Sequence, residues 1–167
     1  LIVTTLLLIL LIIPILIVSL IIFIDDPHGS PFYKQIRIGR HGKKFYMYKF
    51  RSMYVDADKR KQELLHRNEM DGPVFKIKDD PRITRVGKFI RKCSIDELPQ
   101  LFNVFKGNMS LVGPRPERPE IAAEYEKTLP EFALRLQVRA GLTGYAQVYG
   151  KYNTTPYDKL LMDLMYI

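Results

Sequence analysis

The sequence predicts an α+β domain, mostly helical, that is held at a membrane by an apolar N-terminal segment. Residues 1–24 contain no charged side chain, two aromatic and β-branched segments flank a glycine-containing turn, and much of the remainder shows helical spacing of apolar side chains. We therefore expect a membrane segment over residues 1–24 and a polar domain over residues 25–167. We also expect the natural chain to extend beyond both of these ends.

The N-terminal segment is long enough to cross a bilayer, because about 20 apolar residues span the hydrocarbon core as a helix. It lacks the small-residue cleavage site of a signal peptide and is too long for one. Pro14 lies in the middle of the segment and removes one backbone hydrogen bond, which predicts a kink or a break. Two topologies follow: a kinked transmembrane helix, or a re-entrant helix that turns at Pro14 and returns to the same face.

The net charge of +8 belongs wholly to the polar domain, because all 26 Lys and Arg and all 18 Asp and Glu follow Ile24. Basic charge after the membrane segment predicts a cytoplasmic position under either topology. Anionic lipid and a phosphate-bearing substrate are the partners that such a domain attracts. The sequence has no zinc-ligand pattern, and its basic residues are scattered instead of lining one helix, so we expect no nucleic-acid partner.

The polar domain begins with a predicted β-hairpin, in which residues 32–38 and 44–50 flank the turn 39–42. Helical patterns follow over residues 55–70, 84–92, from Ser94 to Lys106, and over 119–128, 131–138 and 158–167. Short extended pieces are expected at 110–112 and 145–148. The predicted fold is therefore a mostly helical domain with a small sheet.

Asp96 and Glu97 are adjacent carboxylates at a predicted helix start. One interpretation is structural, because Ser94 and Glu97 match a capping box and acids favour the first turn of a helix. The other is catalytic. Arg91 lies just upstream, Pro99 makes the helix start rigid, and a helix N-terminus binds anions. One acid would then attack a phosphorus atom while its neighbour holds a divalent metal.

Two further residues are candidates for this chemistry. Arg115 lies between Pro114 and Pro116, which fix the backbone and therefore the direction of a guanidinium that matches phosphate oxygens. An ordinary surface arginine is the alternative. Asp163 follows Leu160 in the last predicted helix, and the pattern alone favours an exposed position for it.

Four segments, in chain order, carry a resemblance to a known family: residues 46–53 (YMYKFRSM), 80–104 (DPRITRVGKFIRKCSIDELPQLFNV), 106–116 (KGNMSLVGPRP) and 138–148 (VRAGLTGYAQV). Together they resemble the bacterial sugar transferases, the monotopic phosphoglycosyl transferases, over nearly the whole chain. The resemblance implies an enzyme that transfers a sugar 1-phosphate from a UDP-sugar donor to undecaprenyl phosphate and releases UMP. Its product would start the assembly of a capsule, an exopolysaccharide or a glycoconjugate.

The resemblance also implies roles for individual residues. Asp96 matches the nucleophile, which forms a covalent phosphosugar–aspartyl intermediate, and Glu97 matches the carboxylate that binds the cofactor Mg2+. Arg91 and Arg115 match positions near the substrate phosphates. Asp163 matches a late aspartate near the active site.

For the membrane segment, the resemblance implies a re-entrant helix broken at Pro14. This monotopic arrangement would place the catalytic domain on the cytoplasmic face of the bacterial inner membrane. The sequence departs from the family at Ile13, where a serine often precedes the proline. Glucose or galactose is the expected sugar.

Two other functions stay open on the residues alone. One is a non-catalytic basic adaptor bound to anionic lipids, for which Asp96 and Glu97 would be dispensable. The other is a membrane-bound nucleotide-sugar hydrolase, which needs no lipid acceptor. The sequence does not determine the oligomeric state, and a homo-oligomer is compatible with it.

Overall fold

The structure is a computed structural model that describes residues 2–69, 74–75, 77–151 and 154–167. The chain forms two compact units. The first, which we call the dyad unit because it contains Asp96 and Glu97, comprises residues 6–34 and 48–99. The second, which we call the loop unit because it contains the loop around Arg115, comprises the residues up to Thr5, residues 35–47 and residues 100–167.

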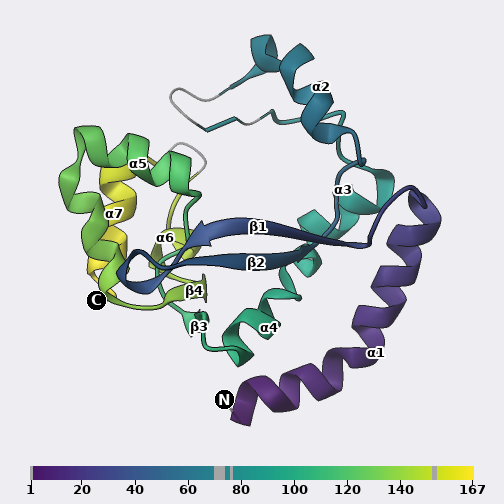
Figure 1. Cartoon of the computed structure of the whole chain (residues 1–167), viewed down its shortest axis with the longest axis horizontal. Helices are drawn as coiled ribbons and strands as arrows, with labels where there is room; N and C mark the ends of the chain where they lie inside the picture. The colour runs from purple at the N-terminus through teal and green to yellow at the C-terminus, as the bar shows by residue number, and fades with distance from the viewer. Residues whose placement is uncertain (1, 70–73, 76, 152–153) are drawn as a thin grey trace. The chain divides into compact units, whose positions relative to one another are not determined.

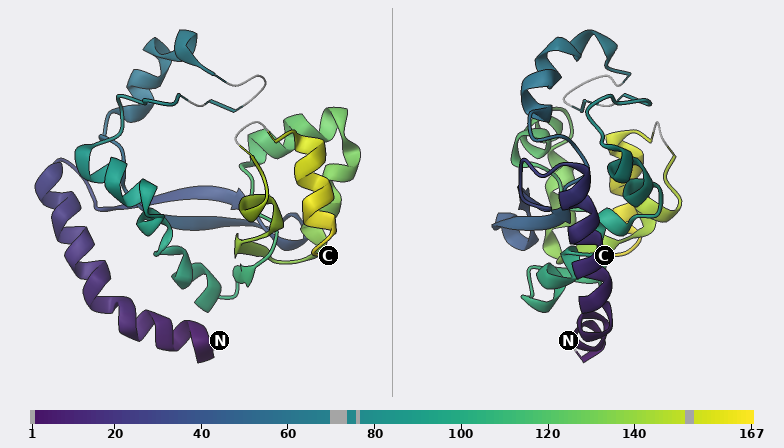
Figure 2. Two further views of the ribbon diagram at one scale, coloured as in Figure 1. Left: turned by 180° about the vertical axis from the view of Figure 1, so that it is seen from behind. Right: turned by 90° about the vertical axis from the view of Figure 1, so that its right-hand side faces the viewer.

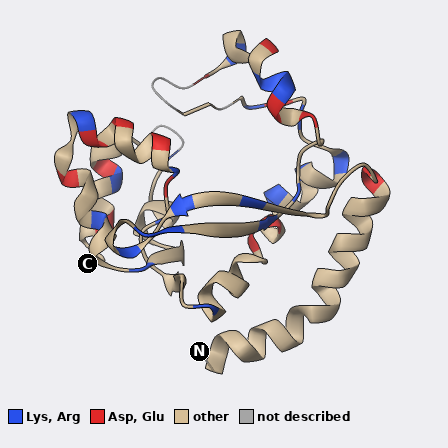
Figure 3. Cartoon of the chain, in the orientation of Figure 1, with Lys and Arg blue, Asp and Glu red and all other residues tan. Residues whose placement is uncertain are grey.

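Helix α1 (Ile2–Asp25) is the apolar segment that the sequence predicts. In the part of the chain that the structure describes, it is the one helix long and apolar enough to cross a membrane. Figure 1 shows it as a curved helix, and Figure 3 shows no Lys or Arg along it. The predicted break at Pro14 is wrong, because the proline lies inside a continuous helix.

The hydrogen bond that Pro14 removes from the helix is not replaced by the nearby serine hydroxyl. The missing N–H of Pro14 leaves the carbonyl of Leu10 without its helical donor. The hydroxyl of Ser19 does not compensate for this loss, because it donates to the carbonyl of Ile15 at 2.7 Å. That contact joins residues four apart and is the usual back-bond of a helical serine.

The predicted hairpin is confirmed residue for residue as β1 (Phe32–Ile38) and β2 (Lys44–Phe50). Both views of Figure 2 show the two strands side by side. The connecting turn is the 3-10 segment η1 (Arg40–Gly42). His41 and Gly42 have φ angles of 55° and 74°, so the tight reversal depends on the left-handed conformation at both positions.

The dyad unit contains α2 (Ala57–Glu63), η2 (Leu65–Arg67), α3 (Arg85–Lys92) and η3 (Ile95–Glu97). The predicted helix over residues 55–70 is therefore shorter than expected, and its expected end at Met70 lies outside the described residues. The helix predicted at 84–92 is confirmed as α3. Its first predicted residue, Thr84, is the N-cap, whose hydroxyl accepts the N–H of Gly87 at 2.9 Å.

An apolar cluster joins α1 to the other elements of the dyad unit. Its buried members are Ile15 and Ile22 from α1, Phe50 from β2 and Ile90 from α3. The partly buried side chains packed against them are Leu11, Val18, Val86, Ile95 and Leu98. Helix α1 is therefore part of the core of this unit.

The loop unit contains α4 (Gln100–Phe105), β3 (Met109–Val112), α5 (Pro119–Thr128), η4 (Pro130–Gln137), β4 (Ala140–Thr143), α6 (Tyr145–Val148) and α7 (Pro156–Leu164). Strands β3 and β4 pair in parallel, with Met109 opposite Ala140 and Val112 opposite Thr143. Met47 of β2 packs with Met109 and Ala140 in the core of this unit.

The loop unit departs from the prediction in one element and contains one strand that was not predicted. The extended piece expected at 145–148 is the short helix α6, so that prediction was wrong. The short helix expected at 131–138 is confirmed as the 3-10 helix η4. Strand β4 was not predicted. Its glycine obscures the strand pattern, because Gly141 is required by close packing: a Cβ there would overlap the backbone of Gly113.

Candidate active site

Asp96 and Glu97 lie in the three-residue 3-10 turn η3, not at the start of a long helix. Pro99 explains the difference, because it has no N–H to donate to the carbonyl of Ile95 and so interrupts helical bonding at this point. Ser94 adopts a left-handed conformation with a φ angle of 56°, and its side chain makes no capping hydrogen bond. The capping-box interpretation is therefore wrong, and the acid pair does not lie in the first turn of an α-helix.

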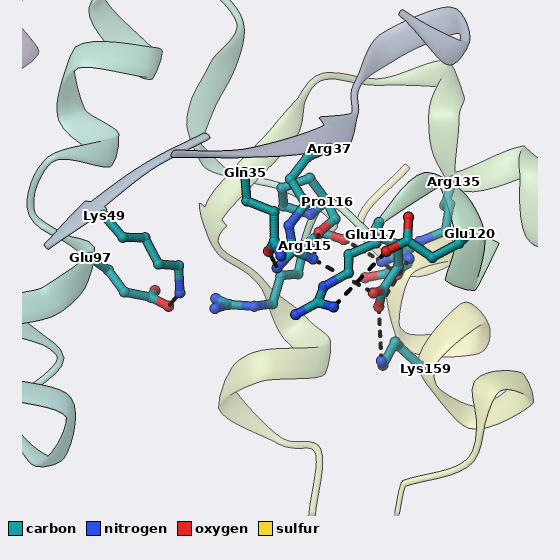
Figure 4. A network of polar contacts seen from close by, with 12 residues as sticks. Gln35, Arg37, Lys49, Glu97, Arg115, Pro116, Glu117, Glu120, Arg135 and Lys159 are labelled. Carbon is teal, nitrogen blue, oxygen red and sulfur yellow. Dashed lines mark hydrogen bonds and ion pairs between the residues drawn. The ribbon is translucent and has the colours of Figure 1, made fainter. Parts of the chain in front are cut away.

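The acid pair instead faces a lysine from β2. The ammonium of Lys49 lies 2.6 Å from a carboxylate oxygen of Glu97 and 3.9 Å from one of Asp96. Figure 4 shows the contact with Glu97. The three side chains are largely buried but open to solvent, with exposed fractions of 19% for Lys49, 13% for Asp96 and 19% for Glu97. Two adjacent carboxylates are thus held together by one cation.

Sequence reasoning missed Lys49, although it lies in the segment 46–53 that carries part of the resemblance. Its position between two aromatic residues of a strand, Tyr48 and Phe50, was the available signal. The spacing of nearly 50 residues between Lys49 and the acid pair gave no reason to connect them.

Arg91 lies in the last turn of α3 and is exposed, in the same unit as the acid pair. The segment before α3 is anchored by the buried pair of Arg82 and Asp80, whose charged atoms approach to 2.6 Å. Burial acts to raise the pKa of Asp80. Hydrogen bonds and charge from Arg82, with a further contribution from Arg91, outweigh burial and lower it. The carboxylate therefore stays ionised and the anchor stays intact.

The predicted loop around Arg115 is held by hydrogen bonds that other residues donate to its backbone carbonyls. The carbonyl of Pro114 accepts the N–H of Gly141 at 2.9 Å. The carbonyls of Arg115 and Pro116 accept guanidinium N–H groups from Arg135 at 2.8 Å and from Arg37 at 3.0 Å. Three successive carbonyls are thus bound, as expected for a rigid loop that presents an arginine.

A buried ionic network lies behind this loop (Figure 4). Arg135 approaches Asp163 to 2.6 Å, and their side chains are 3% and 1% exposed. Glu117 lies 3.1 Å from Lys159, 3.7 Å from Arg135 and 4.0 Å from Arg37. The exposed position that the helical pattern favours for Asp163 is therefore wrong. Its role suggested by the resemblance stays a prediction, and the structure groups it with the Arg115 loop.

The chain was compared with known proteins, and the model of the family described as bacterial sugar transferase matches residues 1–167. The chain belongs to the bacterial sugar transferase family. It is 51% identical to the galactosyl transferase CpsE of Streptococcus agalactiae over 140 residues. It is 46% identical to the undecaprenyl-phosphate galactose phosphotransferase of Salmonella typhimurium and 44% identical to the UDP-glucose:undecaprenyl-phosphate glucose-1-phosphate transferase of Xanthomonas campestris.

These matches cover 83%, 83% and 77% of this sugar transferase, respectively, but only 30%, 29% and 24% of the three relatives. The chain thus spans about a third or less of the curated relatives named here. The relatives' names include both galactose and glucose, so family membership alone does not select the sugar.

The two acidic groups of the buried ionic network, Glu117 and Asp163, differ in how burial and nearby charge affect their pKa values. Burial acts to raise the pKa of Glu117, but the charges of Lys159 and Arg135 outweigh it and lower the value. For Asp163, burial raises the pKa against the opposing attraction of Arg135. Glu117 is therefore the more firmly ionised member of the network.

The acid pair fits the way in which Mg2+ is usually held, by one or two carboxylates together with substrate phosphate oxygens. Among the described residues there is no group of three or more His, Cys, Asp or Glu side chains placed to hold a metal by itself. The adjacent carboxylates of Asp96 and Glu97 are the suitable donors in the dyad unit. Lys49 already contacts Glu97, so a metal there would share this carboxylate with the ammonium or displace it.

Proposed function

We propose that this sugar transferase moves a sugar 1-phosphate from a UDP-sugar to undecaprenyl phosphate. The observation that carries the proposal is the adjacent acid pair, partly open to solvent and neutralised by Lys49, in a member of this family. Two of the relatives described above are named for transfer to undecaprenyl phosphate, which supports the same acceptor here. The apolar helix α1 supports a reaction at a membrane, where such an acceptor resides.

In the first step, a carboxylate oxygen of Asp96 attacks the phosphorus that bears the sugar. The bond between this phosphorus and the oxygen bridging to the uridine-bearing phosphate breaks, and UMP leaves with the bond's electron pair. An acyl phosphate forms, in which Asp96 carries the sugar phosphate. Attack of one anion on another requires nearby positive charge, which Lys49 supplies at the acid pair.

In the second step, a phosphate oxygen of undecaprenyl phosphate attacks the same phosphorus. The bond between phosphorus and the carboxylate oxygen of Asp96 breaks, which regenerates the carboxylate. Undecaprenyl diphosphate sugar then leaves. Covalent catalysis thus divides one difficult transfer into two displacements at one phosphorus. No proton needs to be removed from either nucleophile, since both react as anions.

The remaining roles are proposals drawn from residue chemistry and from the family. Glu97, with Asp96, would hold Mg2+, which supplies charge neutralisation at the phosphate oxygens when bound. Arg91 and Arg115 would each bind substrate phosphate, because a guanidinium offers paired donors to phosphate oxygens. Asp163 would act indirectly, through Arg135 and the Arg115 loop that Arg135 holds.

For its location, we propose that α1, which is curved but unbroken at Pro14, is re-entrant and keeps the catalytic domain on the cytoplasmic face of the bacterial inner membrane. The excess of Lys and Arg that follows α1 supports this orientation. Glucose or galactose is the proposed sugar, and the product would start a capsule, exopolysaccharide or glycoconjugate.

The test is UMP release from UDP-glucose and UDP-galactose, with and without undecaprenyl phosphate, by the wild type and by Asp96→Asn. We expect at most one UMP per enzyme without acceptor, continuous release with it, and neither with Asp96→Asn. The mass of the wild type after brief exposure to donor should increase by one sugar phosphate. Continuous release without acceptor would indicate a hydrolase instead. Activity that survives Asp96→Asn would refute the mechanism.

A further inference from the structure

The end of the membrane helix is attached to two elements of the dyad unit through two successive acids. The carboxylate of Asp25 accepts the backbone N–H of Val86, in the first turn of α3, at 3.2 Å. The carboxylate of Asp26 pairs with the guanidinium of Arg51, which directly follows β2. The helix exit is therefore attached both to the helix that carries Arg91 and to the strand that carries Lys49.

The Arg51 contact is more than a surface ion pair. The guanidinium of Arg51 donates to the carboxylate and the carbonyl of Asp26 and to the carbonyl of Gly29. The side chains of Arg51 and Asp26 are only 10% and 8% exposed. Backbone and ring nitrogens of His28 also lie within hydrogen-bonding distance of the Asp26 carboxylate, at 3.3 Å and 3.0 Å. We call this arrangement the exit clamp, consisting of Asp26, His28, Gly29 and Arg51.

The carboxylate of the exit clamp stays charged near neutral pH. Burial acts to raise the pKa of Asp26, but the hydrogen bonds from His28 and the charge of Arg51 outweigh it and lower the value. Protonation of Asp26 therefore does not open the clamp near neutral pH.

The apolar side chains beside the clamp connect α1 directly to the acid pair. Ile95 precedes Asp96 and Leu98 follows Glu97, and both belong to the cluster that contains Ile22 of α1. A change in the depth of α1 in the membrane would therefore carry the acid pair with it. The interior of a protein is close-packed, so such a shift is transmitted and not absorbed.

We propose that Asp26 and Arg51 are positioning residues that fix α1 against the strand carrying Lys49, and so set the depth at which the acid pair meets a lipid-borne phosphate. The inference rests on the proposed function. The nucleotide-sugar donor arrives from water, whereas the acceptor phosphate is confined to the membrane surface. Loss of the clamp should therefore impair transfer to the acceptor more than release of UMP.

The experiment measures the two steps separately in the intact protein, reconstituted in phospholipid nanodiscs. Asp26→Asn removes the charge of the clamp. Arg51→Lys keeps the charge but cannot reach all three acceptors at once. Single-turnover UMP release reports the first step, and discharge of the labelled enzyme to undecaprenyl phosphate reports the second. For both variants we expect discharge to slow about tenfold or more, since a small misplacement has effects of this order, and UMP release to change less than about twofold.

A short-chain prenyl phosphate dispersed in detergent micelles distinguishes positioning from general damage. If the clamp sets depth in the bilayer, the defect should shrink with this acceptor, because its phosphate is not held at a fixed level. Asp56→Asn is the matched control, because it breaks an exposed Asp–Arg pair with Arg60 in the same unit, 2.7 Å long. It should leave both steps unchanged.

Each outcome of these measurements decides for or against either the positioning inference or the proposed function. Equal slowing of both steps by Arg51→Lys, with either acceptor, would mean that the clamp serves folding alone and would overturn the inference. Unchanged discharge in both clamp variants would overturn it as well. A wild type that releases no UMP would instead refute the proposed function, so the two failures are separable. If Asp26→Asn does not fold, Arg51→Lys decides the question.

Discussion

The pairing of Lys49 with the acid pair predicts that a neutral side chain at position 49 slows the first chemical step. Lys49→Gln keeps a polar side chain but removes the charge that lies 2.6 Å from Glu97 and 3.9 Å from Asp96. Two adjacent carboxylates would then approach an anionic donor without this cation. Repulsion between like charges should raise the barrier for attack on phosphorus.

The magnitude follows from the burial of the three groups. Removing one preorganised donor from a water-excluded active site costs about 2.7–4 kcal/mol of transition-state stabilisation, whereas an exposed ion pair contributes about 0–1 kcal/mol. Side chains that are 13–19% exposed lie between these limits, so we expect about 2 kcal/mol of lost transition-state stabilisation, or a rate about thirtyfold lower.

The assay is single-turnover UMP release, measured by rapid quench with labelled donor. Lys59→Gln is the matched control, because Lys59 is an exposed lysine on α2 of the same unit. It should leave the rate unchanged. A rate for Lys49→Gln within about twofold of wild type, at full donor occupancy and unchanged melting temperature, would refute the reasoning. It would mean that the Lys49 contact serves packing or folding and not charge neutralisation.

Other predictions concern the scaffold around the acid pair and the arginine loop. Gly87→Ala should destabilise the protein by about 1–3 kcal/mol, because its Cβ would overlap the carbonyl oxygen of Ser52; thermal unfolding measures this. Asp163→Asn should cost about 3 kcal/mol, the lower end of the range for breaking a buried pair, because Arg135 loses the carboxylate at 2.6 Å and keeps only Glu117 at 3.7 Å; denaturant unfolding measures this. Because the folded-state pKa of Glu117 is lowered, its stabilisation is present above the ordinary value of 4.5 and is lost as the pH falls below it. The difference in unfolding free energy between wild type and Glu117→Gln should therefore shrink between neutral pH and about pH 3.

Elements with strong local signals were predictable from the sequence. The hairpin β1–β2 was found residue for residue, because two segments rich in aromatic and β-branched residues flank a turn that contains two glycines. Helices α3 and α5 begin at a threonine cap and at a proline in the first turn, which are signals of the chain itself. Local chemistry was sufficient in each of these cases.

Elements that depend on distant contacts were not predictable in the same way. Strand β4 exists because it pairs with β3 about 30 residues earlier, and its Gly141 is required by contact with the Gly113 backbone. Pro99 interrupts what looked like one long helix, so the acid pair lies in a short turn. The first error arose from a glycine that a tertiary contact requires, and the second because Pro99 was interpreted as a residue of the first turn of the helix.

In the candidate site, too, residues with a local signal were predictable and residues that depend on distant contacts were not. Asp96, Glu97 and Arg115 were recognisable because charged residues stand beside prolines in short segments. Lys49 and Arg135, which contact or hold these residues, come from segments far away in the chain. The sequence therefore indicated which groups bear charge, but not which groups neutralise them.

Asp163 shows how the periodicity of one helix can be interpreted in two ways. The leucines of α7 appeared to mark its buried face, which placed Asp163 in solvent. However, Leu160 and Asp163 are three residues apart and share one face, and it is this face that is buried. Leu161, which directly follows Leu160, is 44% exposed. A buried carboxylate requires a cation at hydrogen-bonding distance, and Arg135 provides it at 2.6 Å. Since Arg135 also donates to the carbonyl of Arg115, the burial of one carboxylate stabilises the loop that presents the proposed phosphate ligand.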